Sequence, residues 1–146
     1  MSLKPLNILL ADDDADDCSF FEKALMEIPI ATHLKTVPDG EQLMDYLFKN
    51  LENLPEVLFL DLNMPLKNGF ECLVEIKENE RFRNLPVVMF STAFPKNSIY
   101  EEELINNLLK IGALHFIRKP NDIGHLSQEV YQALNMVAEK INFSIG

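Results

Sequence analysis

The chain has 146 residues, of which 47% are hydrophobic and 25% are charged, as in an ordinary globular domain of this length. Its formal net charge of −10 offers nothing to neutralise the phosphates of DNA or of an anionic membrane, so we expect neither as a partner. Two cysteines are too few for a disulfide framework and no apolar run is long enough to cross a bilayer, which together predict a cytoplasmic protein.

Short apolar runs alternate with longer amphipathic segments along the chain. In chain order the predicted strands are 7–11, 33–37, 57–61, 87–91 and 115–118. The predicted helices are 15–28, 41–49, 70–79, a helix capped by Asn97 or Ser98 that runs to Ile111, and 123–141. Pro29 is expected to end the first helix and Gly112 the fourth. Five βα units in strict alternation predict an α/β fold, a doubly wound parallel five-stranded sheet with helices on both faces.

Polar side chains follow four of the five predicted strands. Asp12 and Asp13 come after the first strand and Asp61 ends the third. Ser91 ends the fourth strand and Lys119 follows the fifth. Because the carboxyl ends of parallel strands meet at one edge of the sheet, where such folds bind ligands, we expect these five side chains to form one pocket.

The charges of this pocket predict a divalent metal ion. Two carboxylates about 4 Å apart repel by about 4 kcal/mol at an effective dielectric constant of 20. Lys119 offsets one negative charge, and a hard cation such as Mg²⁺ suits the rest. We therefore predict a Mg²⁺ site made by Asp12, Asp13 and Asp61, to which the following loop adds the backbone carbonyl of Asn63.

A carboxylate beside Mg²⁺ and a lysine can attack a phosphoryl group and form an aspartyl phosphate. Such a transfer needs little beyond positioning and charge stabilisation. Asp61 is the best nucleophile because it ends the central strand, and Lys119 and the Ser91 hydroxyl would contact the remaining phosphoryl oxygens.

The acids behind Asp13 have a different interpretation. Asp14 is predicted to be the N-cap of the first helix, with Asp17 in a box-like relation three residues later. Asp16 and Asp17 would also favour the positive end of the helix dipole.

Four stretches in order, "ILLADDD", "FLDLNMPLKNG", "VVMFSTA" and "FIRKP", resemble the receiver domain of two-component response regulators over about residues 7–140. The resemblance implies a flavodoxin-like sheet with strand order 2-1-3-4-5 and Asp61 as the phosphoacceptor. It implies Asp13 as a direct Mg²⁺ ligand, Asp12 as a ligand directly or through water, and the Asn63 carbonyl as a further ligand.

The same resemblance implies that Ser91 is the switch hydroxyl and Lys119 the lysine of the site, before a proline that is usually cis in the family. Phe116 matches the aromatic switch position, although it is equally consistent with a plain core residue. The phosphoryl group would come from a sensor histidine kinase, a phosphotransfer protein or a small acyl phosphate. Phosphorylation would then change the surface that binds a downstream protein.

The chain departs from the chemotaxis-type pattern between Ser91 and Lys119, where the excess length lies in 93–110, within the expected signalling face. No output module follows the last helix, so we expect residues 1–146 to be a single receiver domain, similar to the stand-alone regulators of phytochrome-type sensor kinases. The apolar positions of the last helix offer a surface for a homodimer, and these are Leu126, Val130, Leu134 and Val137.

Two other classes of protein remain as alternatives. An aspartate-nucleophile phosphohydrolase usually has a second acid two residues after the nucleophile, where this chain has Asn63. A flavin-binding electron carrier of the same fold would need a phosphate loop after the first strand, where the aspartates would repel FMN. We therefore expect no enzyme beyond catalysis of its own phosphorylation and dephosphorylation.

Overall fold

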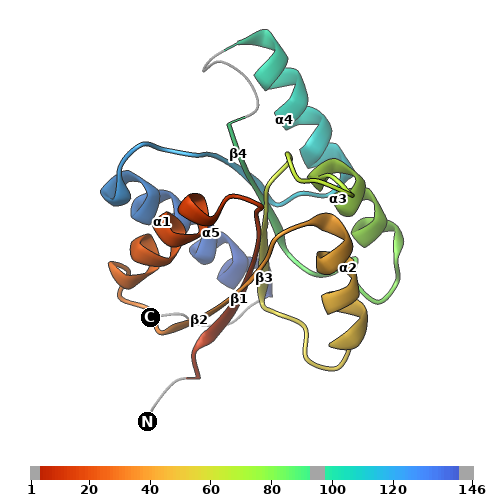
Figure 1. The fold of residues 1–146 in the computed structure, drawn as a ribbon, viewed down its shortest axis with the longest axis horizontal. Coiled ribbons are helices and arrows are strands. Elements are labelled where there is room, and N and C mark those ends of the chain that lie inside the picture. Colours follow the sequence, from red (N-terminus) through yellow and green to blue (C-terminus); the bar gives the residue numbers. More distant parts are fainter. Residues whose placement is uncertain (1–3, 93–97, 142–146) are drawn as a thin grey trace.

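The computed structural model describes residues 4–92 and 98–141, which form ten elements in strict β–α alternation (Figure 1). The strands are β1 (Leu6–Ala11), β2 (Thr32–Val37), β3 (Val57–Leu60), β4 (Val87–Ser91) and β5 (His115–Arg118). The helices are α1 (Ala15–Met26), α2 (Gly40–Lys49), α3 (Gly69–Glu78), α4 (Ile99–Ile111) and α5 (Ile123–Ile141). None of these helices is both long and apolar enough to cross a membrane.

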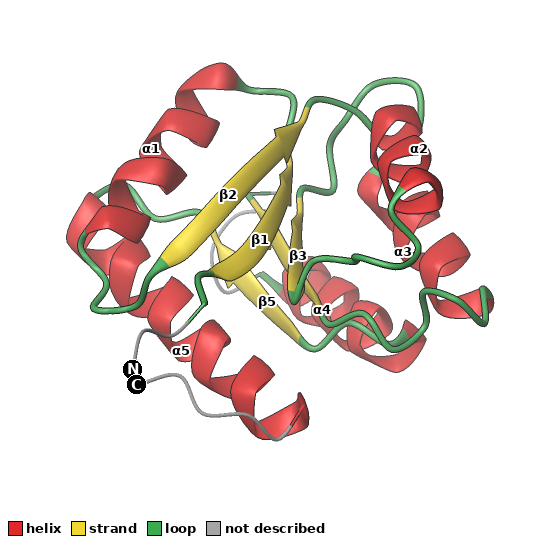
Figure 2. Cartoon of the chain, turned by 90° about the horizontal axis from the view of Figure 1, so that it is seen from below, coloured by secondary structure: helices red, strands yellow, loops and turns green. Residues whose placement is uncertain are grey.

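The five strands form one parallel sheet in the order β2-β1-β3-β4-β5. Helices α1 and α5 cover one face, and α2, α3 and α4 cover the other (Figures 1 and 2). The predicted fold class and strand order are therefore confirmed.

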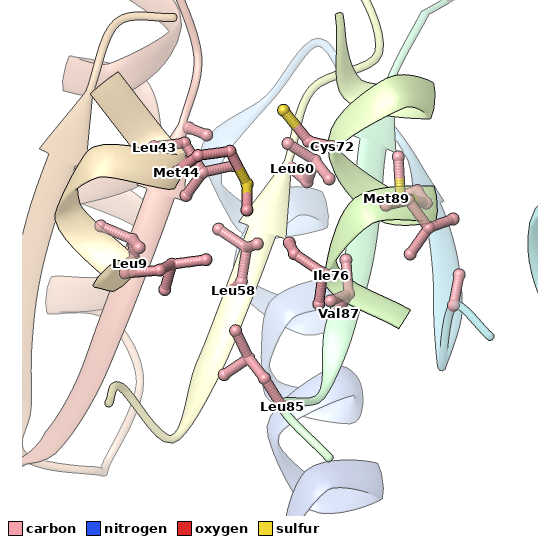
Figure 3. Packing of buried hydrophobic residues seen from close by; sticks show 14 of the residues in the cluster. Leu9, Leu43, Met44, Leu58, Leu60, Cys72, Ile76, Leu85, Val87 and Met89 are labelled. Carbon is pink, nitrogen blue, oxygen red and sulfur yellow. The ribbon is translucent and has the colours of Figure 1, made fainter. Parts of the chain in front are cut away.

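The core has two halves because alternate residues of each central strand point to opposite faces of the sheet. Leu58 and Leu60 of β3 pack towards α2 and α3 (Figure 3), whereas Val57 and Phe59 pack towards α1 and α5. All four residues have 0% exposure. Burial on both faces explains why this strand reads as an unbroken apolar run.

Each helix begins at a side chain that accepts a hydrogen bond from a backbone N–H of the first turn. The capping residues are Asp14, Asp39, Asn68, Ser98 and Asp122. Ser98 is thus the cap of α4, while Asn97, the other candidate, lies outside the described residues. Gly112 ends α4 as predicted, with a φ of 134° that favours glycine.

Several sequence-based boundaries are off by one or two residues, and two of these errors lie near the acidic residues. Helix α1 ends at Met26 rather than at 28, because the chain already turns at Glu27, whose N–H bonds the Ala24 and Leu25 carbonyls. The restriction that Pro29 places on the preceding residue favours an early end. Strand β3 ends at Leu60, so Asp61 is the first residue after the strand.

The suggested dimer surface on the last helix is also wrong. Leu126, Val130, Leu134 and Val137 all have 0% exposure, because they pack against α1 and the sheet. Helix α4 differs, since Glu101 and Leu108 are its only buried residues and Ile99, Tyr100 and Leu109 are exposed. It extends beyond the body of the fold in Figure 1.

Candidate functional site

The hydrogen-bond pattern of the sheet continues for one residue past the ends of three strands, and these residues line the pocket. Asp12, Asp61 and Lys119 are each the first residue after a strand. The Asp12 N–H donates to the Val37 carbonyl at 3.1 Å, and the Asp61 N–H donates to the Ala11 carbonyl at 2.9 Å. The Lys119 N–H donates in the same way to the Ser91 carbonyl at 3.2 Å. The sheet therefore fixes where these three side chains start.

Three carboxylates meet at this edge of the sheet. Asp12, Asp13 and Asp61 each place an oxygen so that the three atoms lie within 4.8 Å of one another. Asp12 and Asp61 are buried, with 2% and 4% exposure, whereas Asp13 is exposed. The predicted convergence of residues from β1 and β3 is thus present.

The ammonium group of Lys119 lies among three acids that are far apart from it in the chain. Its Nζ is 3.3 Å from Asp61 Oδ2 and 2.8 Å from Asp17 Oδ2, both with hydrogen-bond geometry. It is 2.9 Å from Asp12 Oδ2, at an angle outside hydrogen-bond geometry. It also lies 5.2 Å from the centre of the Phe90 ring, within reach of a cation–π interaction.

These contacts shift the pKa values of the buried groups. Burial raises the pKa of the Asp12 carboxyl from 3.8 to about 6, although the Asp14 N–H and Lys119 oppose the shift. Burial alone would lower the pKa of Lys119, but its close contacts with the Asp17 and Asp12 carboxylates and the charge of Asp61 raise it above its ordinary value. Lys119 therefore stays protonated at neutral pH. Asp12 is the acid of the pocket whose ionisation is made less favourable by burial.

The donor set fits Mg²⁺. All the converging ligand atoms are carboxylate oxygens, which a hard divalent cation prefers over nitrogen or sulfur. Asp12 Oδ2 and Ser91 Oγ are buried without a hydrogen-bond partner among the described residues. Buried polar atoms are usually satisfied, so both atoms are suited to a bound ligand.

Two close backbone contacts hold the loop after Asp61. The Gly69 N–H donates to the Leu62 carbonyl at 2.9 Å, and a Cβ on Gly69 would lie 2.1 Å from the Asp61 carbonyl oxygen. Within the loop, the Lys67 N–H donates to the Pro65 carbonyl across Leu66, which has a φ of 69°. The start of α3 therefore packs directly against the backbone of Asp61.

The structure places the remaining predicted residues as follows. The Asn63 N–H donates to Asp61 Oδ1 at 3.3 Å, and its role as a carbonyl ligand stays a prediction. Ser91 is fully buried at the end of β4. Phe116 is half-buried and packs against the α2–α3 half of the core, so its switch role also stays a prediction. The peptide bond between Lys119 and Pro120 is trans, contrary to the cis bond usual in the family.

The sequence-based interpretation of α1 was right about Asp14 and incomplete about Asp17. Asp14 caps the helix by accepting from the N–H groups of Asp16 and Asp17. A reciprocal box is absent here, because the Asp14 N–H donates to Asp12 Oδ1 and the Asp17 carboxylate binds Lys119. Asp17 is thus a pocket residue that the sequence reasoning took for a helix-end charge.

A second contact that the sequence did not reveal lies next to Lys119. Arg118 forms an ion pair with Glu101, a residue of the first turn of α4 that is only 9% exposed. Because Arg118 pairs in register with Ser91, this contact connects the start of α4 to the β4–β5 edge of the pocket.

Residues 8–131 match the family described as the response regulator receiver domain. The chain is similar to protein-glutamate methylesterase/protein-glutamine glutaminase 3 of Vibrio cholerae, with 32% identity over 136 residues, 93% of this chain and 34% of that protein. It spans about a third of the length of this relative and of others of that name. It is also similar to response regulator Rcp1 of Synechocystis sp., with 33% identity over 99 residues, 65% of this chain and 67% of that protein.

Two solved structures share the fold. The Mn²⁺-bound form of response regulator Rcp1 matches with a TM-score of 0.73 and 26% identity, over 88% of this chain and 91% of that one. The phosphorylated cyanobacterial phytochrome response regulator RcpA matches with a TM-score of 0.74 and 26% identity, over 97% and 99% of the two chains. From the family match over most of its length, this chain belongs to the response regulator receiver domain family.

Proposed function

We propose that Asp61 accepts a phosphoryl group from a sensor histidine kinase or a phosphotransfer protein, and that this modification changes which downstream protein the receiver binds. The observation that carries the proposal is the convergence of Asp12, Asp13 and Asp61 within 4.8 Å beside the Lys119 ammonium. In the transfer, an Asp61 carboxylate oxygen forms a bond to phosphorus. The bond from phosphorus to the donor nitrogen or oxygen breaks, and the donor keeps the electron pair.

In this proposal Asp12, Asp13 and Asp61 hold Mg²⁺ together with the Asn63 carbonyl. When bound, Mg²⁺ offsets the charge of the carboxylates and of the phosphoryl oxygens. Support comes from the oxygen-only donor set and from the buried Asp12 Oδ2 that lacks a hydrogen bond. The similar Rcp1 has been solved in a Mn²⁺-bound form, and the similar RcpA in a phosphorylated form.

Lys119 and Ser91 would contact the transferred group. The lysine Nζ is already 3.3 Å from Asp61 Oδ2, so it can hold a phosphoryl oxygen without leaving the pocket. The buried Ser91 hydroxyl gains a partner when it donates to another phosphoryl oxygen. Phe116, on β5 beside Met89, is the residue whose ring would then change position.

The chemistry is confined to Asp61 of this chain. A phosphohydrolase needs an acid near the nucleophile to protonate the leaving group, and the position two residues on holds Asn63, whose N–H binds Asp61. We propose further that the described receiver fold is sufficient for phosphorylation by itself, in line with its similarity to RcpA over nearly the whole of both chains.

The test is intact mass spectrometry after incubation with acetyl phosphate and Mg²⁺. The wild-type protein is expected to gain the mass of one phosphoryl group, and Asp61→Asn to gain none while staying folded. Asp45→Asn, which changes an exposed acid of α2, is the matched control and should label like wild type. Labelling of Asp61→Asn at the wild-type level would place the nucleophile elsewhere and overturn the proposal.

A further inference from the structure

The shortest contact of the Lys119 ammonium is with an acid outside the three-carboxylate cluster. Asp17 lies in the first turn of α1, and its Oδ2 is 2.8 Å from Lys119 Nζ. The contacts to Asp12 and Asp61, at 2.9 and 3.3 Å, are longer. The Lys119 side chain is 14% exposed and the Asp17 side chain 38%, so Asp17 is the more exposed partner of this ion pair.

Asp17 differs from the cluster in what a bound cation does to it. Asp12, Asp13 and Asp61 converge on a shared point, so a metal ion would offset their charges, while Asp17 is absent from that group. Phosphorylation replaces the single charge of the Asp61 carboxylate with the charge of a phosphoryl group, up to about −2. Lys119 then faces two anionic partners, the phosphoryl oxygens and the carboxylate of Asp17.

We propose that Asp17 is a positioning residue that competes with the phosphoryl group for Lys119, an inference that rests on the proposed function of Asp61. In the unphosphorylated protein, Asp17 holds the ammonium on the α1 side of the pocket. A phosphoryl group must draw the ammonium away from Asp17 or share it against the repulsion of a negative charge. Asp17 thereby lowers the affinity of the pocket for the phosphoryl group, compared with a receiver that lacks this acid.

The chain offers a close control for this proposal. Asp16 precedes Asp17 in the first turn of α1, carries the same charge beside the same helix end and is exposed. The Asp16 N–H donates to the Asp14 side chain. Asp16→Asn therefore reproduces the change in net charge and in helix-end charge without touching Lys119. Asp17→Glu keeps the charge and tests whether the carboxylate itself is responsible.

The experiment measures the affinity for beryllofluoride, which imitates the phosphoryl group, by calorimetry in the presence of Mg²⁺. Asp17→Asn is expected to bind about fivefold more tightly than wild type. Asp16→Asn and Asp17→Glu should both bind as wild type does. As a readout free of metal and ligand, the NMR signal of the Lys119 Cε should shift in Asp17→Asn and stay in place in Asp16→Asn.

Unchanged or weaker binding by Asp17→Asn would overturn the proposal, since weaker binding would mean that Asp17 orients the lysine for the phosphoryl group. An equal gain in Asp16→Asn would also overturn it, because the effect would then come from net charge alone. If the wild-type protein itself binds no beryllofluoride with Mg²⁺, the proposed function of Asp61 fails instead.

Discussion

Helix α5 and the acidic edge of the sheet both contain buried side chains, but burial has opposite effects on the stability of the fold in the two regions. On α5, Leu126, Val130 and Leu134 are completely buried against the sheet, and such burial is the main favourable term in folding. At the edge, Asp12 and Asp61 are buried as well, but their charges repel each other and Asp12 Oδ2 lacks a hydrogen bond. Burial in the core therefore favours folding, whereas the repulsion between the buried carboxylates of the pocket opposes it.

The largest effect is expected in the core. Leu134→Ala removes a fully buried side chain from α5 and should lower the free energy of unfolding by about 2–5 kcal/mol. Leu109→Ala on α4, where the side chain is 43% exposed, should change it by less than about 0.5 kcal/mol. Urea unfolding followed by circular dichroism measures both variants. Equal losses in the two would contradict the contrast between the helices.

The next effect concerns the pocket and depends on pH. The folded-state pKa of Asp12 is about 6 against 3.8 for the ordinary group, so the folded state binds the proton more tightly. The stabilisation that comes from this tighter proton binding is fully present below about pH 4 and is lost as the pH rises through about 6. A salt-bridged aspartate shows the reverse dependence. At pH 7.5 without metal, Asp12→Asn should therefore be more stable than wild type, by on the order of 2 kcal/mol.

Urea unfolding of both proteins in EDTA at pH 4, 5, 6 and 7.5 measures this difference. The gain of Asp12→Asn should grow with pH and should shrink when Mg²⁺ is added, because only wild type keeps the full ligand set. A difference in the free energy of unfolding that is constant across this range would show that the pKa of Asp12 is not raised in the folded protein.

The smallest effect is expected on α4. Glu101→Gln removes the charge that pairs with Arg118, and the pair is partly open to water, with side-chain exposures of 12% and 33%. We expect a loss of about 1 kcal/mol. Amide hydrogen exchange should become faster in α4 and stay unchanged in α5. Glu103→Gln, an exposed acid of the same helix, is the control, and equal acceleration in both helices would contradict a local role.

The main pocket could be predicted because it depends only on where strands end. Asp12, Asp61 and Lys119 follow apolar runs, and a parallel sheet brings such positions to one edge whatever the details of packing. The same reasoning could not separate Asp16 from Asp17. That choice depends on the rotation of α1 about its axis, which the packing of Phe21 and Ala24 against the sheet decides.

The error about α5 has a related cause. A row of apolar residues on a helix fits a sheet and a second protein equally well, and the sequence does not say which surface covers it. In this fold, α5 must close the same face as α1, so Val130 and Leu134 are used within the chain. The pairing of Glu101 with Arg118 was equally hidden, because it joins the start of a helix to a strand 17 residues further on.

The contact between Gly69 and the Asp61 carbonyl has a consequence for how this pocket can be lost. A Cβ at position 69 would come within 2.1 Å of that oxygen, so any other residue there must displace Asp61 or the start of α3. A duplicated copy of this protein could thus lose its activity through a substitution at this one position, while the aspartates and the lysine of the pocket stay unchanged. A comparison that checks only those residues would then wrongly classify the inactive copy as active.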